Sequence, residues 1–286
     1  MDLCSEKDIL TLLRRHGFRF SRSLGQNFLT AAWVPRRIAE ASGADASRGV
    51  LEIGPGVGCL TRELAALAGR VAAVELDSRL IPVLAETLAD CPNVTVVPGD
   101  IMKLDLRRLT EEQFPGLAPM VCANLPYNIT SPVLTRLIES CLFSSLTVMI
   151  QREVALRLCA EPGTADYGAF GVFVNYHCVP ELLFDVPPAC FTPAPKVTST
   201  VVRLTARPAP AVAVRDEKLF FRVVRGAFLQ RRKTLVNALA SALSLPKGTV
   251  ADAVAACGLG ATVRGETLSL AEFAALTDEL VRRAEE

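Results

Sequence analysis

Residues 50–61 read V-L-E-I-G-P-G-V-G-C-L-T, and this stretch decides the fold. A short apolar run at 50–53 is followed by glycines at alternate positions, Gly54, Gly56 and Gly58, and a helical pattern begins near Leu60. A strand, a glycine turn and a helix in this order open a nucleotide-binding α/β unit. Glycine is needed where the chain turns sharply and a ligand must approach the backbone, because a Cβ would clash there.

The residues around the turn narrow the choice of ligand. The dinucleotide fingerprint G-x-G-x-x-G requires a glycine at position 59, but the chain has Cys59 there, which disfavours a dehydrogenase. Glu52, two residues before the first glycine, points to a nucleoside ligand other than a dinucleotide. S-adenosylmethionine (AdoMet) suits the turn because it has no pyrophosphate to bind. The glycine pattern alone is also compatible with a strand-to-helix turn that binds no ligand.

Composition places the chain among soluble globular proteins. It has 286 residues, half of them hydrophobic and 21% charged, with a net charge of +1, so overall charge does not indicate a nucleic-acid binder. No apolar run approaches the ~18 to 20 residues of a membrane span. Asp2, Glu6 and Asp8 disfavour a secretory signal or a transit peptide, and we expect a cytoplasmic, monomeric protein.

The nine cysteines are scattered and form no C-x-x-C pair, and the chain has only two histidines. An odd number of cysteines without paired spacing indicates neither a disulfide framework nor a zinc site. Most of them stand among aliphatic residues, as small core side chains in a reducing compartment do. We expect no metal.

Strand and helix patterns alternate after residue 50. Apolar runs predict strands at 50–53, 71–74, 94–97, 120–123 and 146–150. Helical patterns separate them at 60–67, 78–88, 131–142 and 153–160. Nearly all-apolar strands are typical of a parallel sheet covered on both faces, with ligands at the carboxyl ends of the strands. Two further strands at 178–184 and 197–204 complete a seven-stranded, Rossmann-like, doubly wound sheet whose last pair is antiparallel.

Helical patterns also flank this series. Helices are expected at 6–16 and 33–42, ended by Gly17 and Gly43, and at 167–177. Residues 205–214 carry proline and alanine without a clear period and read as a linker. The remaining patterns, at 217–229, 234–243, 250–257 and 271–283, are all helical. The predicted domains are an α/β domain at 1–207, of the kind that could bind AdoMet, and a small all-helical domain at 208–286.

Polar residues follow three of the predicted strands. Glu75 ends the second strand and could accept hydrogen bonds from both ribose hydroxyls of a nucleoside. Asp100 ends the third and could accept from the exocyclic amine of an adenine ring. A single acid at a strand end is as often a solvated helix cap. Two at successive strand ends, downstream of the glycine turn, favour a ligand site.

The fourth strand ends in Asn124-Leu125-Pro126-Tyr127. Proline fixes the backbone and removes a donor, which leaves nearby carbonyl groups free to accept from a ligand. Asn124 adds a side-chain carbonyl and Tyr127 adds a flat face, so the tetrapeptide suits a planar substrate with an NH2 group. A strand ended by a proline turn remains the alternative.

With this tetrapeptide beside the glycine turn, the chain closely resembles the ribosomal RNA adenine N6,N6-dimethyltransferases, in particular the bacterial small-subunit type, the KsgA/RsmA family. The resemblance runs nearly end to end. It is carried by L-G-Q-N-F-L at 24–29, E-I-G-P-G-V-G at 52–58, Glu75, G-D at 99–100, N-L-P-Y at 124–127, V-P-P at 186–188, F-T-P-A-P-K-V at 191–197 and A-F-L-Q-R-R-K-T at 227–234. Thr198 departs from the pattern, since Asp often follows Pro-Lys-Val.

The resemblance implies methyl transfer from AdoMet to N6 of two adjacent adenines in the 3′-terminal hairpin of 16S rRNA in the small ribosomal subunit, with a role in ribosome biogenesis. The residues it assigns to the cofactor are Asn27, Leu29, Gly54, Gly56, Glu75, Asp100 and Asn124. Those it assigns to the target adenine are Asn124, Tyr127 and Phe191, the two aromatic rings stacking on the flipped base. On spacing alone, Gln26 and Asn27 would read as an ordinary turn.

Hydrogen bonds from the two N6 N–H groups to the Asn124 side-chain carbonyl and the Leu125 main-chain carbonyl would orient the nitrogen lone pair without a dedicated general base. RNA contact is expected from Arg222, Arg225, Arg231, Arg232 and Lys233, which fall within twelve residues that contain no acid. Arg14, Arg15, Arg19 and Arg22 form a second cluster. Such runs are commonly only solvated faces.

Two other readings stay open. The related large-subunit enzymes that confer macrolide resistance share this core, although F-L-Q-R-R-K-T at 228–234 favours the small-subunit type. A ribosome-assembly or transcription factor could keep the fold and bind RNA without catalysis. Intact Glu75 and Asn124 to Tyr127 argue against pure binding.

Overall fold

The computed structural model describes residues 1–18, 26–230 and 232–285. The chain forms two compact units, Met1–Ala155 with Glu181–Ala206 and Leu156–Pro180 with Arg207–Glu286. The sequence pattern had placed 156–180 with the sheet. In the structure this segment belongs to the helical unit, because Tyr167, Val172 and Tyr176 pack into the helical core.

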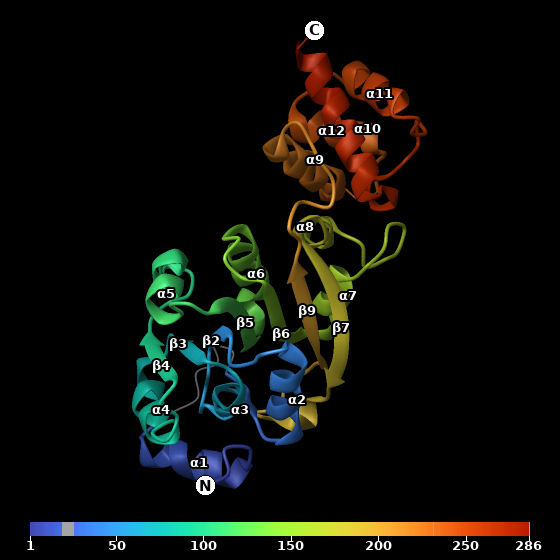
Figure 1. The fold of residues 1–286 in the computed structure, drawn as a ribbon. Coiled ribbons are helices and arrows are strands. Elements are labelled where there is room, and N and C mark those ends of the chain that lie inside the picture. Colours follow the sequence, from blue (N-terminus) through green and yellow to red (C-terminus); the bar gives the residue numbers. More distant parts are fainter. Residues whose placement is uncertain (19–25, 231, 286) are drawn as a thin grey trace. The chain divides into compact units, whose positions relative to one another are not determined.

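The first unit is built on a seven-stranded sheet, coloured from blue to orange in Figure 1. Its order is β4 (Val94–Pro98), β3 (Arg70–Glu75), β2 (Arg48–Ile53), β5 (Ala118–Asn124), β6 (Ser145–Gln151), β9 (Ser199–Ala206) and β7 (Cys178–Val186). The strands from β4 to β6 pair in parallel, and β9 pairs antiparallel with β6. The predicted strands and the antiparallel pair are confirmed. Strand order reverses between β2 and β5, where doubly wound sheets bind ligands.

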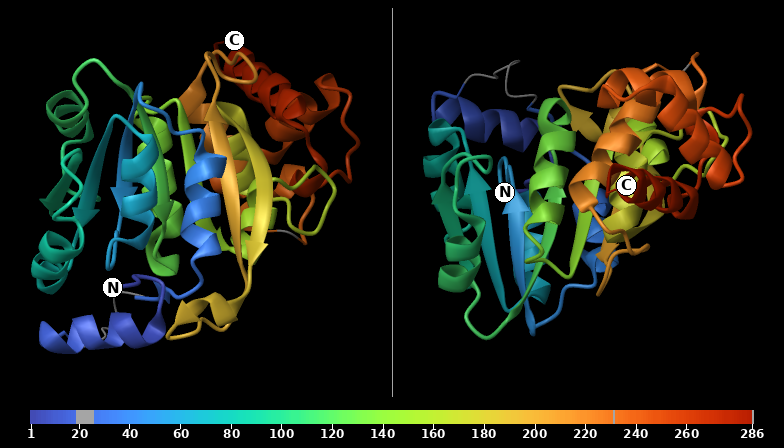
Figure 2. Two further views of the ribbon diagram at one scale, coloured as in Figure 1. Left: turned by 60° about the horizontal axis from the view of Figure 1, so that its bottom comes forward. Right: turned by 90° about the horizontal axis from the view of Figure 1, so that it is seen from above.

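Helices cover both faces of this sheet (Figure 2). They are α2 (Trp33–Ser42), α3 (Cys59–Leu67), α4 (Ile81–Thr87), α5 (Leu106–Gln113), α6 (Thr130–Glu139) and α7 (Arg152–Leu158). The predicted helix at 78–88 begins as a 3-10 turn, Ser78–Leu80, before α4. The sequence pattern missed α5, because only Leu106, Leu109 and Thr110 are buried in the otherwise polar L-R-R-L-T-E-E-Q. Its start is fixed by Asp105, whose carboxylate accepts from the Arg108 N–H at 3.1 Å.

The amino-terminal segment packs beside the glycine turn. Helix α1 (Glu6–Arg15) buries Ile9, Leu12 and Leu13 in a cluster that includes Val57 of the turn. After the first gap in the described residues, β1 (Phe28–Leu29) pairs antiparallel with β8 (Phe191–Thr192). Strands of two residues are too short for a periodic pattern, so this second sheet could not be predicted.

The helical unit consists of α8 (Ala169–His177), α9 (Glu217–Leu229), α10 (Leu235–Leu243), α11 (Lys247–Ala256) and α12 (Leu270–Glu285) around one apolar core. Phe220 and Phe273 are fully buried at its centre. Ser269 and Glu272 form a reciprocal capping box at the start of α12. Val212 and Val214 pack against the same core, so the expected linker is anchored to the helical unit and is not a free tether.

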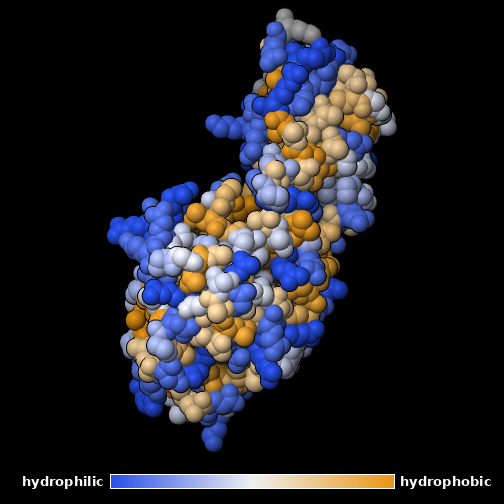
Figure 3. All heavy atoms as spheres, in the orientation of Figure 1, coloured by the Kyte–Doolittle hydropathy of each residue, from blue (hydrophilic) through white to orange (hydrophobic). Residues whose placement is uncertain are grey.

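On the face drawn in Figure 3, exposed hydrophobic side chains lie in small groups among hydrophilic ones. All nine cysteines are free thiols. Within the described ranges, no helix is both long and apolar enough to cross a membrane. The same part of the chain holds no group of His, Cys, Asp or Glu arranged for a metal ion.

Candidate active site

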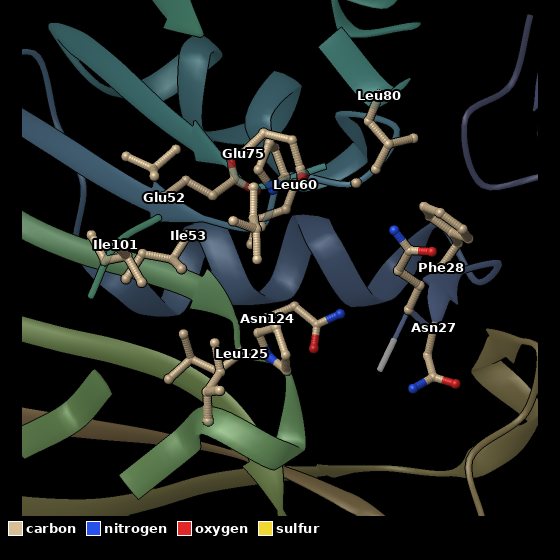
Figure 4. A pocket seen from close by; sticks show the side chains of 18 of the residues that line it. Asn27, Phe28, Glu52, Ile53, Leu60, Glu75, Leu80, Ile101, Asn124 and Leu125 are labelled. Atoms are coloured by element: carbon tan, nitrogen blue, oxygen red, sulfur yellow. The ribbon is translucent and has the colours of Figure 1, made fainter. Parts of the chain in front are cut away.

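A cavity opens at the carboxyl ends of β2, β3 and β5, and Figure 4 shows the side chains that line it. Among its lining residues are all those predicted to bind the cofactor, namely Asn27, Leu29, Gly54, Gly56, Glu75, Asp100 and Asn124. Leu125 and Tyr127, expected to contact the target adenine, line it too. In Figure 4, Glu52 and Glu75 lie on one side of the cavity and Asn124 and Leu125 on the other. The fold therefore brings together residues from five separate segments.

The three glycines of the turn have left-handed backbone angles, with φ of 69° at Gly54, 62° at Gly56 and 92° at Gly58. L-residues with a Cβ rarely adopt these angles. A Cβ on Gly56 would also lie 3.1 Å from the ring of Phe28, and one on Gly58 3.1 Å from Leu88. The turn keeps its backbone open toward the cavity, which fits a ligand held closely along the main chain.

Glu75 ends β3 with a buried carboxylate. One oxygen accepts a hydrogen bond from the backbone N–H of Asp77 at 2.7 Å. Burial raises the pKa of Glu75, while the backbone N–H groups of Asp77, Gly56 and Leu76 oppose that shift. Asp77 is in turn held by Gln26, whose amide donates to it at 2.9 Å. The amino-terminal segment is thus tied to the end of β3 at the cavity wall.

Glu52 also lines the cavity, although the sequence had indicated only that it bears on the kind of ligand bound. It is 1% exposed, and its Oε2 atom has no hydrogen-bond partner among the described residues. Burial raises the pKa of Glu52 to about 8; the neighbouring Glu75 also raises it, and Thr61 opposes the shift. The carboxyl is therefore largely protonated at neutral pH. A buried oxygen without a partner is a feature that a polar group of a bound ligand would satisfy.

The Asn124–Tyr127 segment presents unused acceptors to the cavity. The Leu125 N–H donates to the Met149 carbonyl at 3.1 Å, which holds the segment in line with β6. No described residue donates to the Leu125 carbonyl, and the Asn124 amide makes no hydrogen bond within the described parts of the chain. Figure 4 shows Asn124 extending into the cavity. Both acceptors are available to a substrate amine.

The Tyr127 side chain is held by a contact with β9. Its hydroxyl lies 2.6 Å from the Ser199 Oγ atom at the start of β9. Burial raises the pKa of Tyr127, with the Ser199 hydrogen bond opposing that shift. The hydroxyl therefore stays protonated, and its contact with Ser199 fixes the orientation of the ring.

The other two predicted contacts are placed differently. The Asp100 carboxylate accepts from the Met102 N–H at 2.9 Å and lies 3.8 Å from the Lys103 ammonium, so it is partly engaged. Phe191 is buried, pairs with Leu29 across the β1–β8 sheet and is not among the residues lining the cavity. Sequence reasoning gave no role to Phe28, Ile53, Leu60 and Ile101, apolar residues that also line the cavity.

The basic residues proposed for RNA contact belong to the helical unit. Arg222 and Arg225 are exposed on α9, and Arg232 and Lys233 are exposed just after it. None of these four forms an ion pair within the described residues. Arg231 lies outside the described residues. In the second cluster, Arg19 and Arg22 also lie outside them, and Arg15 is paired with Glu86.

The sequence profile of the ribosomal RNA adenine dimethylases matches residues 17–280. "Ribosomal RNA small subunit methyltransferase A" of Alkaliphilus oremlandii is 45% identical over 98% of this chain and 99% of its own. The protein of the same name from Clostridium perfringens is 47% identical over 98% of both chains.

Two solved structures are similar over most of the chain. A dimethyladenosine transferase from Plasmodium falciparum has a TM-score of 0.76 and 25% identity, covering 90% of this chain and 98% of its own. The 23S rRNA methyltransferase ErmE has a TM-score of 0.68 and 28% identity, covering 89% of this chain and 99% of its own. A profile match over most of the chain and relatives of this identity establish the family. The chain belongs to the ribosomal RNA adenine dimethylases.

Proposed function

We propose that this protein transfers methyl groups from AdoMet to N6 of two adjacent adenines in the 3′-terminal hairpin of 16S rRNA, giving N6,N6-dimethyladenines during ribosome biogenesis. One observation carries the proposal: two unpaired acceptors, the Asn124 side chain and the Leu125 carbonyl, share a cavity with the open glycine turn and Glu75. The small ribosomal subunit or its precursor is the partner, and we place the reaction in the cytoplasm with a monomeric enzyme.

The lining residues fit AdoMet. When bound, it would supply an electrophilic methyl group. Gly54 and Gly56 would admit its methionine part along the backbone, Glu75 would accept from the ribose hydroxyls, and Asp100 would accept from the adenine amine. Asn27, Leu29 and Asn124 would complete the enclosure. Glu52 adds a buried oxygen that could hydrogen-bond a polar group of the cofactor.

The protein's part in the reaction is orientation. The N6 lone pair of adenine is delocalised into the ring, which makes the amine a weak nucleophile. Its two N–H groups donate hydrogen bonds to the Asn124 side-chain carbonyl and the Leu125 main-chain carbonyl, and the nitrogen then directs its lone pair toward the methyl donor. No dedicated general base is needed, because the amine becomes acidic once methylated and releases its proton. After the first methylation the amine keeps one N–H group, which can still donate a hydrogen bond to one of these two carbonyls during the second transfer.

The target base must leave its stack to reach this cavity. Tyr127, held by Ser199, offers one aromatic face, and stacking is worth ~1 to 3 kcal/mol per base. Phe191 is proposed for the other face, and its burial beside Leu29 means that the β1–β8 segment has to shift to expose it. Phosphate contacts come from the basic surface formed by Arg222, Arg225, Arg232 and Lys233, together with Arg231.

Two rival functions are separated by one experiment. A large-subunit methyltransferase is the nearer rival, since ErmE carries the same fold at 28% identity, against 45% and 47% for the small-subunit relatives. An assembly factor without catalysis is the other. The protein is incubated with isotope-labelled AdoMet and either small or large subunits lacking the modification, and the label is mapped. Label on two adjacent adenines of the 3′-terminal hairpin supports the proposal; label on the large subunit supports the first rival, and no label the second.

A further inference from the structure

An exposed group of side chains beside the cavity has no part in the function described so far. It consists of Trp33 and Arg37 on α2 and Phe184 on β7, and we call it the Trp33 platform. Trp33, the chain's only tryptophan, is 43% exposed at the first residue of its helix. Its ring centroid lies 6.2 Å from that of Phe184, with the planes inclined at 50°. The Arg37 guanidinium carbon lies 4.2 Å from the Phe184 ring centroid.

The platform is rigid. Trp33 and Arg37 are four residues apart and therefore share one face of α2. Phe184 stands on the edge strand of the sheet and supports both side chains. The helix itself is fixed below by Val34 and Ile38, which are fully buried. The indole is thus held in place with much of its surface still open to solvent, and a ring that is already oriented loses little entropy when a ligand stacks on it.

The charge around the platform favours an anionic partner. Glu40 is paired with Arg36 at 2.9 Å. Asp185, next to Phe184 in sequence, is paired with Arg152 at 3.1 Å and accepts from Thr200 at 2.6 Å. Arg37 has no acidic partner among the described residues and keeps its charge for a ligand. An exposed aromatic ring beside an uncompensated arginine is the combination that binds single-stranded nucleic acid, through stacking and phosphate attraction together.

The platform is close to the proposed adenine pocket. Leu29 lines the cavity, and Trp33 follows it by four residues, at most about 14 Å along an extended chain. The Thr30 N–H donates to the Cys190 carbonyl at 2.8 Å, so the connecting segment is held against the chain that leads from β7 to Phe191. Enzymes that flip a base also contact the nucleotides beside it.

We propose that the Trp33 platform stacks an unpaired RNA base next to the target adenine, and so helps to select the single-stranded context of the substrate. This inference rests on the proposed function, because a neighbouring nucleotide presupposes the adenine pocket. A protein partner would instead be expected to cover a contiguous apolar area. At the platform the exposed aromatic surface is instead combined with the uncompensated charge of Arg37, so RNA is the better occupant.

The single tryptophan makes the test direct. The full-length protein is titrated with a single-stranded RNA oligonucleotide that contains two adjacent adenines, in the presence of S-adenosylhomocysteine, and tryptophan emission is followed. Stacking is expected to quench the emission and to protect it from acrylamide. Emission and acrylamide access that stay the same while the RNA binds would overturn the proposal, and would point to a ribosomal protein as the occupant.

Variants give an independent measurement. Trp33→Ala is expected to weaken RNA binding by between about 5-fold and about 150-fold, as loss of one stacked base does, and to raise KM for subunits. Trp33→Phe should restore most of the affinity, because it keeps an aromatic face. Leu67→Ala, at another exposed hydrophobic residue of the same unit, is the matched control and should bind as the unaltered protein does. Equal affinity of Trp33→Ala and Leu67→Ala would contradict the proposal.

The two hypotheses fail differently. If the unaltered protein transfers no label to small subunits, the proposed function is wrong, whatever the tryptophan reports. If label is transferred to the two adenines but the Trp33 emission is unchanged on RNA binding, only the platform is wrong.

Discussion

The hydroxyl groups of Tyr127 and Ser199 lie 2.6 Å apart and join the segment after β5 to the first residue of β9. The contact fixes the ring proposed to stack on the target base. Ser199→Ala removes the hydrogen-bond partner of the Tyr127 hydroxyl, and Tyr127→Phe removes the partner of the Ser199 hydroxyl. Each variant should destabilise the protein by about 1 kcal/mol. The double variant should lose less than the sum of the two. A urea-unfolding cycle checks this, and strictly additive losses would contradict a direct interaction.

The same pair separates two properties of Tyr127. Tyr127→Phe keeps the aromatic face and should retain most methyl transfer. Tyr127→Ala removes it and should weaken substrate binding by about 1 to 3 kcal/mol, measured as KM for small subunits. Similar KM values for the two variants would show that the ring does not stack on the substrate.

Glu52 predicts a pH dependence of stability. Its pKa is raised from 4.5 to about 8 in the folded protein, so the stability it contributes is complete below about pH 4.5 and is lost as the pH rises toward 8. The loss is about 1.4 kcal/mol for each pH unit in this window, taken as an order of magnitude. Glu52→Gln cannot ionise, so its stability relative to the unaltered protein should rise between pH 5 and pH 9.

Urea unfolding at pH 5, 7 and 9 measures this difference. Glu75, Cys59 and Cys122 are titratable groups that interact with Glu52, and all three remain in the variant. The exposed carboxyl of Glu139 gives the control: Glu139→Gln should show no comparable trend. A Glu52→Gln difference that stays constant with pH would mean that this carboxyl is already ionised in the folded protein.

Gly56 tests the open turn. Gly56→Ala should cost about 1 to 2 kcal/mol from the left-handed backbone, and its Cβ would press on Phe28 3.1 Å away. Gly116 also has a positive φ, 75°, but has open space where a Cβ would stand. Both alanine variants should lose stability, and only Gly56→Ala should lose AdoMet affinity in calorimetry. Equal AdoMet affinity in both variants would exclude close backbone approach at Gly56.

The basic surface predicts a change in salt dependence. Replacing Arg232 and Lys233 together by Glu should weaken binding to small subunits and reduce the slope of log affinity against log salt by about 0.7 to 0.9 for each lost phosphate contact. Lys247→Glu, an exposed lysine of the same unit, is the control. If the salt-dependence slope is unchanged in the double variant but reduced in the control, the RNA does not contact the end of α9.

Much of the fold follows from patterns that are local. The apolar runs of β2, β3 and β5 and the left-handed glycines between β2 and α3 are visible in the sequence, and the structure places them as expected. Of the predicted ligand residues, Glu75 and Asn124 end β3 and β5, and Asp100 follows the end of β4 by two residues, so sheet topology brings them into one cavity.

What could not be predicted depends on contacts distant in sequence. The two-residue pairing of β1 with β8 buries Phe191 and has no periodic signature. The assignment of 156–180 to the helical unit depends on packing of Tyr167 and Tyr176, which a strand-and-helix pattern does not contain. The raised pKa of Glu52 comes from burial, and the pairing of Arg15 with Glu86 joins residues far apart in the chain.

The central claim is that Asn124 promotes methyl transfer by orienting the adenine amine, and single-turnover transfer by Asn124→Ala tests it most directly. Isotope-labelled methyl transfer to small subunits is measured alongside AdoMet affinity by calorimetry in the same variant. The predicted result is loss of transfer by a factor of at least about 100, a cost of about 3 kcal/mol, while AdoMet binding remains measurable. Near-normal transfer by Asn124→Ala would contradict the account.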